Sequence, residues 1–229
     1  TGNRFGQHSM LDQEEVSSAR GKLRFVPTDT LDIILSADTY SDQTYGVPRY
    51  YTGDRSVNDT FPLIPDTSDF REVAQDLDGR YDRAGWGTSV KVKWDTGLGT
   101  FHSITAYRDY DGKLFDFDFD GIVGRTPDGS QSTEAFPYQR VQLENFSQEV
   151  RLDWQLNSKI SGVSGVYYLD SWQRRDEELE AFGLTGSSAQ TDGAFPGPLD
   201  VLAQEVSTES VAVFTDLTVQ LTDALALSG

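Results

Sequence analysis

Few residues in this sequence have the type and spacing that catalysis requires. Only two histidines occur, His8 and His102, and His102 lies between Phe101 and Ser103 in a polar strand position, typical of an ordinary polar residue. The chain contains no G-x-x-x-x-G-K-[ST], G-x-G-x-x-G, G-x-S-x-G or H-E-x-x-H pattern. It has no cysteine, which excludes a thiolate nucleophile, a thiolate metal site and a disulfide framework. We therefore predict that the protein is not an enzyme and has no cofactor.

One acidic run invites comparison with a calcium-binding loop. Residues 116–121 read Asp-Phe-Asp-Phe-Asp-Gly, with acids at positions 1, 3 and 5 and glycine at position 6. Position 12 of such a loop is a bidentate glutamate, and here it is Pro127. Strand alternation places the three acids on one face, where a cation could bind, but a solvated acidic strand end is the expected interpretation. We predict no metal site.

Ligand recognition is a better use of the polar residues. Arg49, Tyr50, Tyr51 and Arg55 offer stacking surfaces and positive charge to an aromatic or anionic ligand. The structural alternative is that these tyrosines pack a long loop onto its neighbours.

A second polar group, Arg20, Lys22 and Arg24, shares one face of a strand and could line a ligand path. If the following turn centres on Thr28, Arg24 lies opposite Asp32, and a cross-strand ion pair is the structural interpretation.

Composition excludes other partners. Nineteen basic and 37 acidic residues give a formal net charge of −18, so the chain lacks the basic surface that nucleic acids and anionic membrane surfaces attract. The apolar fraction is 37%, yet 12% of the residues are aromatic, and no apolar run is long enough for a membrane-spanning helix. A membrane β-barrel remains compatible with this hydropathy because only alternate residues of its strands are apolar.

The dominant hydrophobic period is two, which predicts an all-β protein. In residues 146–154, for example, Phe146, Val150, Leu152 and Trp154 alternate with polar residues. We predict about eight strands, near 16–26, 30–41, 84–95, 100–119, 144–156, 162–178, 206–221 and 224 onward. Only residues 69–77 have helix-like spacing, and there we expect one or two helical turns within a loop.

The connections alternate between short and long. Short turns occur near residues 27–29, 96–99, 157–159 and 222–223, and long loops near 42–83, 120–143 and 179–205. In an up-and-down meander, all the short turns therefore lie at one rim and all the long loops at the other, as in an outer-membrane barrel. Phe25, Trp94, Phe101 and Trp154 lie beside the short turns, as expected for an interfacial aromatic belt. A soluble antiparallel sandwich would show the same periodicity.

Several segments, taken in order, resemble TonB-dependent outer-membrane receptors. They are residues 18–28 followed by 31–33, residues 103–110, residues 146–152, residues 165–169, and residues 213–216 with 221–223. No single segment is diagnostic, but five in the same order are fairly specific, and they span residues 16–229.

The resemblance implies a fold and a function. We expect residues 1–229 to be part of one antiparallel transmembrane barrel of 22 strands, an internal fragment without the plug domain that fills such barrels. The implied function is active uptake of a scarce small-molecule ligand, such as an iron–siderophore complex, across the outer membrane of a Gram-negative bacterium. The implied partners are that ligand, the TonB complex acting through the missing plug, membrane lipid and lipopolysaccharide.

Two other functions remain as alternatives. A passive pore or a small structural barrel would have no plug and would need no inner-membrane energy; a closed barrel of eight strands fits the strand count. A soluble β-sandwich, binding carbohydrate for example, would bury its apolar strand faces in protein.

Overall fold

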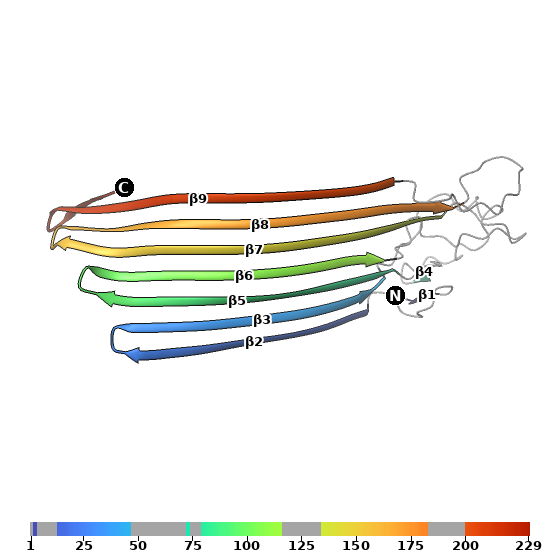
Figure 1. Cartoon of the computed structure of the whole chain (residues 1–229), viewed down its shortest axis with the longest axis horizontal. Coiled ribbons are helices and arrows are strands. Elements are labelled where there is room, and N and C mark those ends of the chain that lie inside the picture. Colours follow the sequence, from blue (N-terminus) through green and yellow to red (C-terminus); the bar gives the residue numbers. More distant parts are fainter. Residues whose placement is uncertain (1, 4–12, 47–71, 74–78, 116–133, 183–199) are drawn as a thin grey trace, which may run out of the picture.

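The computed structural model describes residues 2–3, 13–46, 72–73, 79–115, 134–182 and 200–229. Seven long strands and the short β10 form its main sheet (Figure 1). They are β2 (Gln13–Thr28), β3 (Leu31–Tyr45), β5 (Arg80–Thr96), β6 (Gly99–Phe115), β7 (Glu134–Asn157), β8 (Ile160–Phe182), β9 (Asp200–Thr222) and β10 (Leu225–Ser228). Two short strands, β1 (Gly2–Asn3) and β4 (Glu72–Val73), pair in parallel with each other.

The long strands form one antiparallel up-and-down sheet in the order β10-β9-β8-β7-β6-β5-β3-β2. Each of these strands pairs with its neighbour in sequence, as the predicted meander requires. The short turns lie together at one end of the sheet, here called the turn end, and the strand ends that the longer connections join lie at the other, the loop end (Figure 1). The sheet is open, with β2 and β10 as its edges, so the strands do not close into an eight-stranded barrel.

Most strands extend farther toward the loop end than their hydrophobic pattern predicts. For example, β7 begins at Glu134 rather than near 144, and β8 continues to Phe182 rather than ending near 178. In the β7 extension the apolar residues Val141 and Leu143 lie on the face opposite Phe146, so the extension does not continue the alternation of the apolar part, but it does continue the backbone ladder. Residues 116–119 of the predicted fourth strand lie outside the described residues. In the region expected to contain helical turns, the described residues Glu72 and Val73 form β4 instead.

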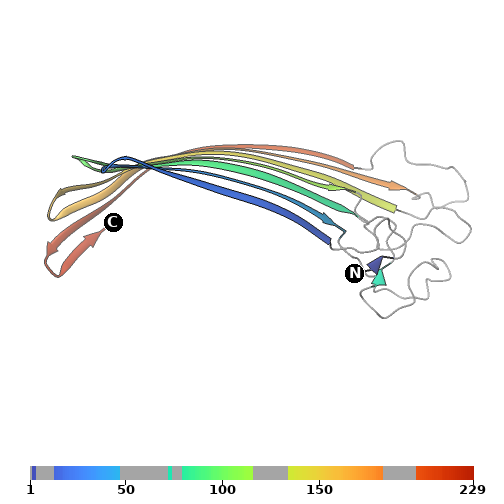
Figure 2. The same ribbon diagram turned by 90° about the horizontal axis from the view of Figure 1, so that it is seen from below.

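The sheet is a single layer, bent and twisted along its length (Figure 2). Among the described residues, Val73 is the one buried hydrophobic side chain, and it lies outside the large sheet. Large apolar side chains of the sheet are exposed instead: Val213 is 80% exposed, Leu23 62% and Trp94 50%. No described residue belongs to a helix long and apolar enough for a membrane span.

Candidate functional site

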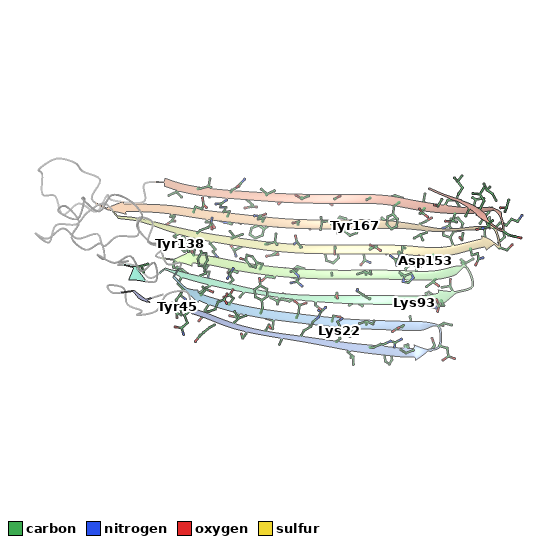
Figure 3. All side chains as sticks on the ribbon, turned by 180° about the vertical axis from the view of Figure 1, so that it is seen from behind. Lys22, Tyr45, Lys93, Tyr138, Asp153 and Tyr167 are labelled. Carbon is green, nitrogen blue, oxygen red and sulfur yellow. The ribbon has the colours of Figure 1, made fainter. Side chains whose placement is uncertain are left out.

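The two faces of the sheet differ in chemistry, and strand register fixes which residues share a face. One face, here called the apolar face, carries the paired side chains Leu23–Leu35, Leu35–Val90 and Val150–Val166. The opposite face, here called the charged face, carries Lys22, Lys93, Asp153 and Tyr167, which Figure 3 labels on β2, β5, β7 and β8. A sheet with one apolar and one charged face needs two different environments.

Two rows of aromatic residues border the apolar face. The turn-side belt consists of the four residues expected from the sequence: Phe25, Trp94, Phe101 and Trp154. The loop-side belt consists of Trp86, Tyr107, Phe146 and Tyr168, in which the ring centroids of Trp86 and Tyr107 are 5.3 Å apart and those of Phe146 and Tyr168 are 6.2 Å apart. The sequence analysis missed the loop-side belt, although the aromatics at 86 and 146 each precede a tryptophan of the other belt by eight residues.

The separation of the belts is slightly smaller than the apolar band, about 25 Å tall, of outer-membrane barrels. The segment of β5 from Trp86 to Trp94, both included, has nine residues, the smallest number that a tilted transmembrane strand needs. Eight steps of about 3.3 Å give about 26 Å along the strand, or about 20 Å along the membrane normal at a tilt of about 40°. The residues of β5 between the belts on this face are Thr88, Val90 and Val92.

Polar side chains on the apolar face satisfy one another. The Gln148 amide nitrogen donates hydrogen bonds to Ser103 Oγ (3.0 Å) and to the Glu149 carbonyl (3.0 Å), and its oxygen accepts one from Thr105. The indole nitrogen of Trp154 donates to Ser164 Oγ at 3.0 Å. Such internal pairing is required where no water is available as a partner.

The tyrosines of the loop-side belt are oriented by carboxylates. The hydroxyl of Tyr107 donates to Glu144 and that of Tyr168 to Glu209, each at 3.2 Å. Both glutamates lie nearer the loop end than the tyrosine that they bind, so the phenol groups point toward the polar extensions. An apolar ring with a hydrated hydroxyl is the arrangement favoured at a membrane–water interface.

On the charged face near the turn end, acids and bases form pairs. Arg24 binds Asp32 with an Nη2–Oδ2 distance of 2.7 Å, which confirms the expected ion pair, although the backbone partner of Arg24 is Ile34. His102 Nε2 lies 3.0 Å from Asp153 Oδ2. His102 is thus placed by a cross-strand carboxylate, in agreement with its interpretation as an ordinary polar residue of the charged face.

Nearer the loop end, glycines allow large side chains to lie across the strands. A Cβ at Gly87 would be 3.0 Å from Arg108 Nη2, and one at Gly85 would be 2.7 Å from the ring of Tyr40. Across Gly87, Arg108 on β6 reaches Asp38 on β3, with Nη2–O distances of 3.1 and 3.3 Å. Because Gly85 and Gly87 of β5 have no side chain, this bridge between the non-adjacent strands β3 and β6 is sterically feasible.

Beside this bridge is a shallow hollow of about 400 Å³. Its polar lining consists of the side chains of Ser18, Arg20, Asp38, Tyr40 and Arg108. These residues come from β2, β3 and β6 and share the charged face. The hollow therefore combines two guanidinium groups and a phenol with one carboxylate.

The strand extensions beyond the loop-side belt carry ion pairs on the apolar side. Arg140 binds Asp111 through two hydrogen bonds, of 2.7 and 3.1 Å, and Arg174 binds Asp176 at 2.9 Å. The hydrogen bond from Arg140 lowers the pKa of Asp111 below its ordinary value, and that from Arg174 does the same to the pKa of Asp176. Charged pairs thus lie beside the aromatic pair Phe115–Tyr138 beyond the belt, which makes this part of the apolar side more polar than the part between the belts.

The four residues predicted to bind a ligand, Arg49, Tyr50, Tyr51 and Arg55, lie outside the described residues, as does the acidic run 116–121. In the described part of the chain, no three histidine, aspartate or glutamate side chains are grouped so that they could hold a metal ion. The hollow was missed because its residues come from three strands. Arg20 was recognised as a possible path residue, but Tyr40 and Arg108 carry no local signal.

Comparison with known proteins gives only distant likeness, and only among solved structures. No family model and no curated protein matches the chain. Among solved structures, the chain is similar to the ferric yersiniabactin uptake receptor FyuA from Yersinia pestis, with 13% sequence identity and a TM-score of 0.43. The match covers 97% of this chain and 38% of the receptor chain, so the chain spans well under half of that protein. The likeness is too distant to identify a family or a ligand for this chain.

Proposed function

We propose that this chain forms part of the wall of an outer-membrane transport barrel, with its apolar face toward lipid and its charged face toward the lumen. The observation that carries the proposal is the single-layer sheet whose apolar face, bounded by two aromatic belts, is not covered by any described residue. Exposed apolar surface of this extent requires an apolar environment. A bilayer supplies one along the whole height between the belts.

The geometry favours a barrel wall over a soluble sandwich for a further reason. In a sandwich, the apolar face would be covered by a second sheet about 10 Å away. Here the described strands of the large sheet, seven long and one short, all belong to one meander. The hydrogen bonds of Tyr107 and Tyr168 to carboxylates at the loop end also indicate a polar boundary at the height of the belt.

The finer proposal is active uptake of a small-molecule ligand such as an iron–siderophore complex. In this scheme the loops and a plug capture the ligand, the TonB complex acts on the plug, and the ligand passes along the lumen. The role of this chain is to supply wall, belts and part of the loop surface, including Arg49, Tyr50, Tyr51 and Arg55. It makes and breaks no covalent bond, and its outer surface contacts lipid and lipopolysaccharide.

Tryptophan fluorescence tests the lipid-facing orientation. Single-tryptophan variants keeping only Trp94 or Trp154 are reconstituted in vesicles whose lipids carry bromine either near the head group or near the chain end. We expect stronger quenching by bromine near the head group for both. A tryptophan introduced by Val90→Trp should be quenched best by bromine near the chain end, and the matched Ser89→Trp, on the charged face, by neither lipid. Equal quenching at positions 89 and 90 would refute the assignment of faces.

Uptake measurements test the transport step. Cells that produce the protein are given a panel of siderophores loaded with radioactive iron, with and without an intact TonB complex. Active transport predicts uptake that disappears when the complex is deleted. A passive pore predicts uptake that is unchanged by the deletion, and a structural barrel predicts none in either strain.

A further inference from the structure

We propose that the hollow lined by Ser18, Arg20, Asp38, Tyr40 and Arg108 binds a monoanionic carboxylate. The hollow lies on the charged face where β2, β3 and β6 bring together two arginines, a tyrosine and an aspartate. In the proposed barrel this face lines the lumen, so the physiological role of the site, a carboxylate contact on the ligand path, rests on the proposed function. Binding itself depends only on the side chains of the sheet.

Arg20 supplies a cation that has no ion-pair partner in the described part of the chain. Its backbone partner on β3 is Asp38, the carboxylate nearest to it in register. Asp38, however, binds Arg108 through both oxygens, at 3.1 and 3.3 Å. Among the described residues, no carboxylate forms an ion pair with Arg20. The planar guanidinium presents a fork of N–H donors that matches the two oxygens of a carboxylate and also those of a phosphate, so the choice between these anions depends on charge.

Arg108 is held in place before a ligand arrives. Its guanidinium lies over Gly87, where a Cβ would be only 3.0 Å from Nη2, and its contact with Asp38 fixes the far end of the side chain. Because only Nη2 binds Asp38, the other N–H donors of this guanidinium remain for a second acceptor. A donor fixed in this way costs less conformational entropy on binding than a free surface arginine.

The charge of the hollow selects the class of ligand. Two arginines and one aspartate leave a net charge of one positive unit, because Asp38 neutralises one guanidinium. A singly charged carboxylate neutralises this site, whereas a phosphate dianion would leave one negative charge uncompensated in the field of a chain whose overall charge is −18. The Tyr40 hydroxyl, on the same wall, adds a neutral donor.

Benzoate is a suitable probe, with benzamide as its neutral isostere and inorganic phosphate as the competing anion. The chain is held in detergent micelles at pH 7 and low salt, and binding is followed by isothermal titration calorimetry. We expect a Kd for benzoate on the order of 1 mM, no measurable binding of benzamide, and weaker binding of phosphate. Arg20→Gln should weaken benzoate binding about five- to tenfold, as expected for loss of one partly exposed charged donor.

Lys22→Gln is the matched control because Lys22 lies on the same strand and face as Arg20 and loses the same charge. It should change the Kd less than about twofold, and Arg20→Lys should give an intermediate value. Near-ultraviolet circular dichroism establishes that each variant is folded. Equal loss in Arg20→Gln and Lys22→Gln, tighter binding of phosphate than of benzoate, or no binding to the unmodified chain would overturn the proposal. If the chain binds benzoate but fails the lipid-quenching test, the carboxylate site is supported and only its location in a barrel lumen is refuted.

Discussion

A single charge placed between the aromatic belts gives a quantitative test of the lipid-facing orientation. Val90 lies midway between Trp86 and Trp94 on β5, four residues from each. At about 3.3 Å per residue and a tilt of about 40°, its Cα lies about 10 Å from either belt along the membrane normal. Val90→Arg therefore places a guanidinium near the bilayer midplane, which should reduce the free energy of unfolding by about 2–4 kcal/mol.

The matched control is Ser89→Arg. Ser89 is the preceding residue on the same strand, but it pairs with Ser36 and Ala106 on the charged face. An arginine there reaches water and neighbouring acids, so we expect a change below about 1 kcal/mol. Thr88→Arg, two residues nearer the loop-side belt on the apolar face, should give an intermediate loss because the cost decreases toward the interface.

Equilibrium unfolding in guanidinium chloride, from phospholipid vesicles of defined chain length, measures all three variants. The expected order of destabilisation is Val90→Arg, then Thr88→Arg, then Ser89→Arg. Equal losses at positions 89 and 90 would refute the face assignment. Equal losses at positions 88 and 90 would refute the depth assigned to the belts.

Three further predictions concern polar contacts. Thr105→Val should lower the free energy of unfolding by about 1–3 kcal/mol because the Gln148 oxygen loses its donor in lipid, and adding Gln148→Leu should restore most of that stability; vesicle unfolding measures both. The pKa of Asp111 is lowered in the folded state, so its contribution to the free energy of unfolding is complete above about pH 3.9 and is lost as the pH falls through the lower folded-state pKa. The variant Asp111→Asn should therefore show a smaller loss of stability with acid than the unmodified chain, in a stability–pH curve measured between about pH 5 and 2. Gly87→Ala should displace Arg108 and reduce benzoate binding several-fold, whereas Gly21→Ala, where a Cβ meets nothing within 4 Å, should leave binding unchanged in the same titration.

The sequence predicts much of the sheet because alternation is a direct consequence of strand geometry. Where one face is apolar, as in β7 from Phe146 to Trp154, the strand is identified and its orientation is fixed. Ile34, an exception to the alternation, has a structural explanation: it pairs with Lys91, which pairs on its other side with Ile104. Two apolar neighbours on the charged face can thus pack along the aliphatic stem of the lysine.

The remaining features depend on contacts between strands. In the extension of β7, Val141 and Leu143 lie on the face opposite Phe146, so the strand is identified by the backbone ladder that it continues and not by one continuous apolar face. The bridge from Arg108 to Asp38 crosses an intervening strand and needs Gly87 at one register position. Neither the skipped strand nor the glycine beneath the guanidinium can be recognised from the local sequence, because 70 residues separate the two partners.

In the proposed barrel, the long extensions of the strands would determine how far from the membrane a large particle first meets this protein. From Phe146 of the loop-side belt to the start of β7 at Glu134 is twelve residues, or about 40 Å of strand. At a tilt of about 40°, this places the end of the sheet about 30 Å above the interface. Strands that project this far would hold the loops above the lipid head groups and their sugars, where antibodies and bacteriophages can reach them. The loop sequences would then be under selection from antibodies and bacteriophages as well as from the ligand, whereas the belt residues would be under selection only for their contact with lipid.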